Sequence, residues 1–485
     1  PGYTPCFKTF HALFKNLIAI NPKYRSIQVV TIQNYKFDLL KMIRSGNDLL
    51  KNTDILDDMN SFRGWLINEN KSVDGLIGAD EYYPKQKRSF TLQDYLLVMT
   101  EYQKLKDEAN AIDFDDMQYI CYRELISGDY SDKIKKEFQE TYLQVMIDEY
   151  QDICPIQVSI MDELIGSNYN SLEAIGDDDQ CIYSFRGGDP KFIIDFEFNY
   201  PNAKRYFLST NYRCPIEVLQ FAAALVEKNQ FRVKKDIYGV KEGGSVKLLD
   251  THGSFSDFLT ELRTDLLSDT VAVLVRENSS RTLLGDRLIR SGIPVDMDNP
   301  KWYLYNTKVW KRLMSIIKMV KWSDNLVLKS MGWLVFPYMK KDELKAYENS
   351  NVLWVEDCLS GKFNTSPKIR EIIEAMIETE DASKLIDYAF KLVEDNYKRG
   401  SKKGLFNLDT IVDQVKYIQE IAVGFTLEDF EKNVKETKTK LDRFIGSDSL
   451  KIYTMHSVKG LEFPIVYIYG ANDDVFLKDS VLSQY

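Results

Sequence analysis

The sequence has few of the residues that build metal or disulfide sites. Its 485 residues include six scattered cysteines and three scattered histidines, with no Cys-x-x-Cys pair. This usage predicts a reducing, cytoplasmic setting and does not indicate a histidine-rich metal site. No apolar run reaches the roughly eighteen residues of a membrane helix, and no basic segment precedes an apolar one near the start. We therefore expect neither a membrane span nor a signal peptide.

The charge balance also limits the possible partners. The formal net charge is −10, from 63 Lys and Arg against 73 Asp and Glu. Such a chain is not expected to coat nucleic acid electrostatically, although a local basic groove on an acidic body remains compatible with it. Its length predicts several domains with sizeable cores.

Two acidic runs follow short apolar stretches that we interpret as strands. Asp148 and Glu149 come directly after residues 143–147, and residues 176–180 (GDDDQ) follow residues 171–175. Two parallel strands joined by a helix form a βαβ unit, whose polar strand ends meet at one edge of the sheet. One carboxylate there can hold Mg²⁺, and its neighbour can orient or deprotonate a water. For an isolated Asp-Glu pair, a solvated acidic turn is the commoner alternative.

Hydrophobic periodicity elsewhere predicts an α/β protein with helical insertions. Mainly helical patterns fill residues 26–109 and, after a tryptophan-rich stretch that begins at Trp302, continue to about Phe444. The acids of residues 113–116 are expected in the first turn of a helix, where the helix dipole favours them. Further helices are predicted at 9–20, 155–164, 215–228 and 279–291, and further strands at 203–208, 270–275, 450–454 and 464–470.

Six segments carry a family resemblance. They are TFHAL (9–13), DFDDM (113–117), DEYQD (148–152), GDDDQCIYSFRG (176–187), LSTNYR (208–213) and TMHSVKGLEF (454–463). In this order they resemble the motifs of UvrD/Rep/PcrA-type superfamily 1 ATP-dependent DNA helicases. The resemblance implies two RecA-like, P-loop NTPase-type α/β lobes, both incomplete, each with a mainly helical insertion. The first lobe would comprise 1–25 and 110–215 with insertion 26–109, and the second 216–320 and 446–485 with insertion 321–445.

The resemblance implies a role for each residue of a nucleotide site. Asp148 would hold Mg²⁺, and Glu149 would activate the attacking water. Gln180 is similar to the γ-phosphate sensor of the family. Arg186 and Arg213 resemble the two arginines that grip the phosphates, a role that suits a planar, permanently charged group.

Two further residues resemble nucleotide contacts. Tyr212 is similar to the aromatic residue that stacks near the base, and Glu462 to the acid that reaches the nucleotide from the second lobe. A packing tyrosine and a surface glutamate are the alternatives.

Five residues resemble DNA contacts. Tyr183 and Phe185 would stack on single-strand bases, each stack contributing about 1–3 kcal/mol. Thr9, His11 and His456 resemble positions that touch the DNA backbone or bases. Core aromatics, a helix cap and hydrogen-bonded histidines remain the alternatives.

Two family features are missing from the sequence. It contains no Gly-x-x-x-x-Gly-Lys-[Ser/Thr] loop, and no arginine follows Arg443 to serve as the last arginine of the site. The family places the loop before the TFHAL segment, so we expect the sequence to be a piece of a longer protein. Its own binding of ATP and Mg²⁺ is expected to be weak or absent.

The expected function is that of a 3′ to 5′ DNA helicase acting on single-stranded and partly duplex DNA. A protein partner could bind through the helical insertions. Two alternatives stay open, namely the helicase part of a helicase-nuclease subunit and a non-catalytic DNA-binding module.

Overall fold

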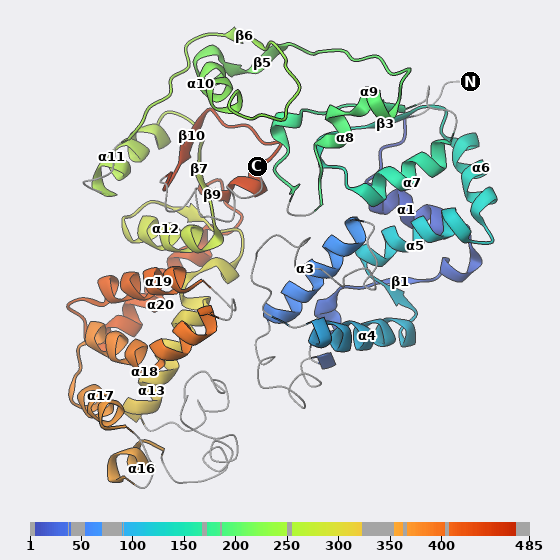
Figure 1. Cartoon of the computed structure of the whole chain (residues 1–485). Coiled ribbons are helices and arrows are strands. Elements are labelled where there is room, and N and C mark those ends of the chain that lie inside the picture. Colours follow the sequence, from blue (N-terminus) through green and yellow to red (C-terminus); the bar gives the residue numbers. More distant parts are fainter. Residues whose placement is uncertain are drawn as a thin grey trace. The chain divides into compact units, whose positions relative to one another are not determined.

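The computed structural model describes residues 5–36, 38–39, 54–69, 90, 92–166, 172–184, 187–249, 255–322, 354–361, 366–402 and 407–471. The described residues form two compact units, one ending at Leu249 and the other beginning at Phe255 (Figure 1). Within these ranges, no helix is long and apolar enough to cross a membrane.

Helices form most of the core of the first unit. The helix predicted at the start is confirmed as α1 (Phe10–Ile18), where the Thr9 hydroxyl caps the first turn by accepting from the Ala12 N–H at 3.3 Å. α1 packs on α5 (Phe114–Ser127), and α5 packs on α6 (Ser131–Thr141) and α7 (Pro155–Ile165). The apolar face of α1 and the inner faces of these helices share one buried cluster. This cluster supports the strands that follow.

The predicted βαβ unit is confirmed. β3 (Val145–Ile147) and β4 (Leu172–Ala174) are parallel neighbours with Ile147 opposite Ala174, and α7 connects them. Short 3-10 turns follow both strands, at Tyr150–Asp152 and Asp178–Gln180. Because the strands are parallel and in register, both acidic runs begin at the same edge of the pair.

A second parallel pair brackets the helical segment of the first unit. β1 (Gln28–Val29) pairs with β2 (Ala111–Ile112), so the chain leaves and returns at neighbouring points. Between them lie α3 (Asp54–Asn68) and α4 (Leu92–Glu108). The helical pattern predicted for residues 26–109 is thus present in the part that the structure describes.

The strand predicted at residues 203–208 was wrong. Short helices α8 (Lys191–Ile194) and α9 (Phe196–Asn199) precede this segment, which has no regular structure and exposes Leu208 to 94%. The strand begins later, as β5 (Thr210–Pro215), and pairs in parallel with β6 (Tyr238–Lys241) across α10 (Ile216–Val226). An apolar stretch becomes a strand only where a ladder partner is available, and this ladder begins with the Tyr238 N–H donating to the Ser209 carbonyl.

The second unit contains a four-stranded parallel sheet in the order β10-β7-β9-β8. Three predicted strands are confirmed as β7 (Val271–Val275), β9 (Leu450–Thr454) and β10 (Ile465–Ile468), and β8 (Val295–Asp296) adds the edge next to β9. α11 (Phe255–Leu266) precedes the sheet, and the predicted helix after β7 is α12 (Asn278–Arg290). The α/β class with parallel sheets is therefore confirmed.

Helices dominate the rest of the second unit, as predicted. They pack on one another (Figure 1). Their buried side chains form one continuous cluster with those of the sheet and α12. Asp286 on α12 is 2% exposed and accepts from Arg290 Nε at 2.7 Å and from the hydroxyls of Tyr305 and Tyr417. This contact ties α12 to the helical layer. The helices are α13 (Lys308–Trp322), α16 (Trp354–Ser360), α17 (Pro367–Glu378), α18 (Ala382–Lys402), α19 (Leu408–Ala422) and α20 (Leu427–Phe444).

Candidate functional site

The first acidic pair lies at the carboxyl end of β3, as predicted. Asp148 and Glu149 are both exposed. Glu149 turns the chain sharply with φ 54° and ψ 39°, a left-handed conformation, and its N–H donates to Asp148 Oδ1 at 2.9 Å. The turn leaves two carboxylates next to each other in contact with solvent, an arrangement of hard oxygen donors that suits a divalent cation.

Gln151 contacts Glu149 of this pair, and sequence reasoning assigned it no role. Its side chain is fully buried, its Nε2 donates to Glu149 Oε2, and its Oε1 accepts from the Asp177 N–H at 3.0 Å. A Cβ added at Gly176 would lie 2.4 Å from Gln151 Oε1, so only glycine lets the two turns approach this closely. The glycine before the second acidic run was the available sequence signal for this close approach.

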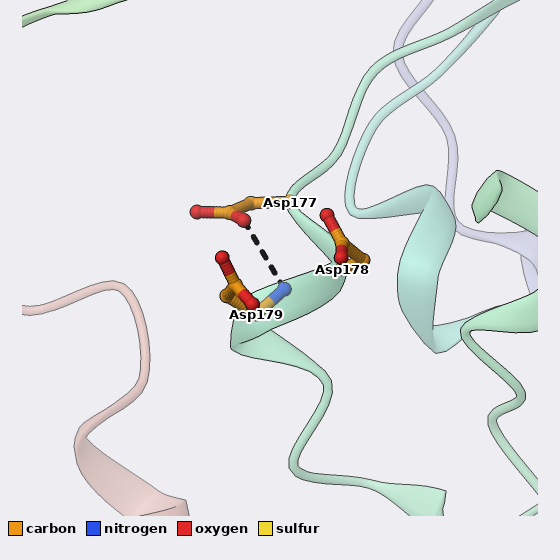
Figure 2. Close-up of side chains that lie close together, drawn as sticks. All are labelled: Asp177, Asp178 and Asp179. Carbon is orange, nitrogen blue, oxygen red and sulfur yellow. Dashed lines mark hydrogen bonds between the residues drawn. The ribbon is translucent and has the colours of Figure 1, made fainter. Parts of the chain in front are cut away.

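The second acidic run forms a turn after β4. Asp177 caps the turn by accepting from the Asp179 N–H at 3.2 Å, as Figure 2 shows. Gln180 is exposed, and its Nε2 donates to Asp177 Oδ2 at 2.8 Å. The structure therefore brings the predicted residues Asp148, Glu149 and Gln180 to one edge of the β3–β4 pair.

The aspartate triad of this turn, Asp177, Asp178 and Asp179 (Figure 2), has the spacing of a metal site. The Lys235 ammonium already contacts all three carboxylates, at 2.5, 2.6 and 2.9 Å. Arg232 adds two hydrogen bonds to Asp179, at 3.0 and 2.7 Å. Burial alone would raise the pKa of Asp179, but these hydrogen bonds outweigh it and lower the pKa. We therefore assign no metal site to the triad, because the Lys235 ammonium and the Arg232 guanidinium already contact its carboxylate oxygens.

The acids of residues 113–116 also lie where they were predicted. Asp113 is the N-cap of α5, and it forms a reciprocal capping box with Asp116. The sequence did not reveal the partners of these acids, Arg63 on α3 and the fully buried Lys106 on α4. The Asp113, Asp115 and Asp116 carboxylates and the two cations form a buried ion network that links α3 and α4 to α5.

The pKa values of two carboxyl groups in this network shift in opposite directions. Burial raises the pKa of Asp115 to about 6, although Arg63 opposes the rise from 3.5 Å. Burial also acts to raise the pKa of Asp113, but Arg63 and Lys106 outweigh it and lower that pKa.

Two predicted DNA contacts lie at the start of α1. Thr9 is exposed and serves as the helix cap, which was its alternative reading. His11 is half-buried, with its ring edge-on to Phe114 at 5.2 Å between centroids, and burial lowers its pKa. A DNA contact at either residue stays a prediction.

The other predicted residues of the first unit lie in two places. Tyr183 is half-buried just after the turn that carries Gln180, whereas Phe185 and Arg186 lie outside the described residues. Tyr212 and Arg213 lie on β5 in its separate two-stranded sheet, and Tyr212 is 77% exposed. A ring this exposed is not a packing residue of the unit that contains it.

The last two predicted residues belong to the second unit. His456 is half-buried in the 3-10 turn Met455–Val458 directly after β9, and Glu462 is exposed shortly before β10. Both therefore lie on the connection between two parallel strands, as the motif around them predicted.

Comparison with known proteins decides the family. Residues 9–201 match the UvrD/REP helicase N-terminal domain, and residues 206–479 match the UvrD-like helicase C-terminal domain. The chain belongs to the UvrD-like helicase family.

Curated relatives of this UvrD-like helicase chain are similar at low identity. A putative ATP-dependent DNA helicase YjcD of Bacillus subtilis is 28% identical to the chain, in an alignment that covers 77% of the chain and 51% of that protein. A probable DNA helicase II homolog of Mycoplasma capricolum is 22% identical, and the alignment covers 98% of the chain and 69% of that protein. The ATP-dependent DNA helicase PcrA of Staphylococcus epidermidis is 24% identical, and the alignment covers 81% of the chain and 57% of that protein. The chain thus spans about half the length of the first of these relatives.

Along the sequence of this UvrD-like helicase chain, the match to the N-terminal domain ends at residue 201 and the match to the C-terminal domain begins at residue 206, just before β5. Arg232 and Lys235 fall in the part that matches the C-terminal domain, and the aspartate triad falls in the part that matches the N-terminal domain. Their ion pairs therefore join a basic segment of one matched domain to an acidic turn of the other.

Proposed function

We propose that the protein carrying this chain is an ATP-dependent DNA helicase that moves 3′ to 5′ along single-stranded DNA and unwinds duplexes. The observation that carries the proposal is the placement of Asp148, Glu149 and Gln180 at the carboxyl ends of two adjacent parallel strands. Ligands of α/β sheets bind at this edge of the strands. Family membership supports the nature of the ligand, a nucleoside triphosphate with Mg²⁺.

We assign three roles at this edge. Asp148 would hold Mg²⁺ through its carboxylate, and Glu149 would accept the proton of the attacking water. Gln180 would contact the γ-phosphate or the water, since an amide can donate to one and accept from the other. When bound, the metal neutralises charge on the phosphates. The exposed carboxylate oxygens fit such a hard cation.

The remaining nucleotide contacts are proposed for the rest of the chain. Arg186 and Arg213 would grip the phosphates, Tyr212 would stack near the base, and Glu462 would reach the nucleotide from the second lobe. The 77% exposure of Tyr212 supports its role, because the ring has a face available for stacking. Residues 1–485 contain no Gly-x-x-x-x-Gly-Lys-[Ser/Thr] sequence, so no residue here is assigned the role of that loop.

We further propose that the lobes have the domain bounds predicted from the sequence. Insertions 26–109 and 321–445 would then offer surfaces for duplex DNA or a protein partner. The parallel β1–β2 pair at the ends of the first insertion supports its bounds. Thr9, His11, Tyr183, Phe185 and His456 would contact the single strand.

The test is ATPase activity stimulated by single-stranded DNA, measured on the natural protein that carries this chain. We expect Glu149→Gln to lower kcat by about 10²–10⁴-fold, the usual contribution of a general base. Glu173→Gln, a control at an exposed carboxylate on β4, should leave kcat within about two-fold. An unchanged rate in Glu149→Gln would remove the assigned base, and a protein without DNA-stimulated ATPase would refute the proposed function.

A further inference from the structure

We propose that Gln151 is a positioning residue that holds Glu149 and Gln180 in a fixed relation through the turn at Asp177. This inference rests on the proposed function and deepens it. It gives a role to a residue that touches neither the nucleotide nor the metal in that proposal.

The first support is the burial of Gln151 and the pairing of both ends of its amide. The side chain is 0% exposed, Nε2 donates to Glu149 Oε2, and Oε1 accepts from the Asp177 N–H at 3.0 Å. A carboxylate can only accept and a backbone N–H can only donate, so the amide has a single satisfactory orientation. Gln151 therefore joins the two turns, because it donates a hydrogen bond to Glu149 in the first and accepts one from Asp177 in the second.

The second support is the continuation of the hydrogen bonds to Gln180. Asp177 offers its N–H to Gln151 and its Oδ2 to Gln180 Nε2, the latter at 2.8 Å. Asp177 thus donates a hydrogen bond to Gln151 through its backbone and accepts one from Gln180 through its side chain. The proposed base and the proposed γ-phosphate contact are linked by three consecutive hydrogen bonds.

The third support is the exposure of Glu149. An exposed glutamate on a turn has several accessible rotamers, and catalysis by a base needs one of them. The bond from a buried amide restricts the carboxylate without removing it from solvent. Gly176 contributes by leaving room for the amide oxygen, which a Cβ there would approach to 2.4 Å.

If Gln151 had a purely structural role, its only function would be to accept the hydrogen bond from the Asp177 N–H. Gln151→Glu separates the two roles, because it keeps an acceptor for Asp177 and replaces the donor toward Glu149 with a second carboxylate. Gln151→Met removes both. Gln157→Glu is the matched control, since Gln157 on α7 also accepts from a backbone N–H and donates to a side chain, that of Gln118.

The first measurement is DNA-stimulated ATPase on the natural protein. We expect Gln151→Glu to lower kcat at least ten-fold with the KM for ATP changed less than three-fold. Gln157→Glu should change neither kcat nor the KM for ATP by more than about two-fold.

The second measurement needs neither nucleotide nor activity. Amide hydrogen exchange at Asp177 should become at least ten-fold faster in Gln151→Met and stay near wild type in Gln151→Glu. Gln180→Ala serves as the comparison, because it leaves the Asp177 N–H paired with Gln151.

A wild-type kcat in Gln151→Glu would overturn the positioning role, as would unchanged exchange at Asp177 in Gln151→Met. The failure of the proposed function is distinguishable from this result. If Glu149→Gln also leaves the rate unchanged, the assigned base is wrong, whereas an impaired Glu149→Gln beside an unaffected Gln151→Glu refutes only the role of Gln151.

Discussion

Replacing Lys106 with methionine should destabilise the first unit far more than a surface substitution. The Lys106 ammonium is fully buried, 3.1 Å from Asp113 Oδ2 and hydrogen-bonded to Asp116. Methionine keeps most of the aliphatic volume. It loses, together with the charge, the cation–π contact that the ammonium makes with the Tyr102 ring at 4.4 Å to its centroid. The substitution therefore mainly removes a charge.

The expected magnitude follows from the charges of the buried ion network. Two cations now face three carboxylates, and after Lys106→Met only Arg63 would remain. Removing one partner of a buried ion pair typically costs about 3–5 kcal/mol, because the other charge stays buried without compensation. The carboxylates can relieve part of this cost by binding a proton, so the loss should be largest above pH 7 and smaller near pH 5.

The assay is hydrogen exchange at the amides of α4 and α5, which reports the free energy of local opening. We expect exchange in Lys106→Met at least about 100-fold faster than in wild type, equivalent to nearly 3 kcal/mol. Lys104→Met on the same helix is the control, since Lys104 is 62% exposed and its pairs with Glu101 and Glu108 are at 3.7 and 3.9 Å. Such surface pairs contribute about 0–1 kcal/mol. Equal effects of the two variants would refute the reasoning, as would the absence of energetic coupling between Lys106→Met and Asp116→Asn.

Three further predictions concern both units. The pKa of Asp115 is raised to about 6 in the folded chain, so it reduces stability as pH rises from about 4 to 6. Asp115→Asn should then stabilise the chain by up to about 3 kcal/mol at pH 7.5 but not at pH 4, and thermal unfolding that shows no such pH dependence would contradict this. Tyr417→Phe should cost about 1.5–3 kcal/mol in urea unfolding, because buried Asp286 loses a donor at 2.8 Å, and an unchanged midpoint would oppose it. Gly176→Ala should displace Gln151 and lower the DNA-stimulated ATPase rate at least ten-fold, since small misplacements in a site cost up to about 100-fold. A wild-type rate in that variant would show that the site does not need the close approach.

Local patterns predicted much of the fold. The helix α1 with its Thr9 cap, the β3–α7–β4 unit and the strand–helix pair β7–α12 each depend on residues close together in sequence. The placement of Asp148, Glu149 and Gln180 at one edge followed from the same unit, because parallel strands carry their ends to the same side. The edge of the candidate site was therefore predictable.

Contacts between distant segments could not be predicted in this way. Lys235 is 58 residues from Asp177, and Arg63 is 50 residues from Asp113, so no local pattern pairs them. The strand placed at residues 203–208 was wrong for a related reason, since its true position depends on a partner strand at Tyr238–Lys241. Gln151 is near Glu149 in sequence, but its burial depends on the turn at Gly176 in a later segment.

The left-handed backbone of Glu149 has a consequence for how the sequence can change. A glycine adopts φ 54° and ψ 39° without steric penalty, whereas a residue with a Cβ there costs about 1–2 kcal/mol. Selection for thermal robustness alone would therefore favour losing the carboxylate at this position. Under the proposed role of Glu149 as the base, substitutions at position 149 that raise stability are expected to lower turnover.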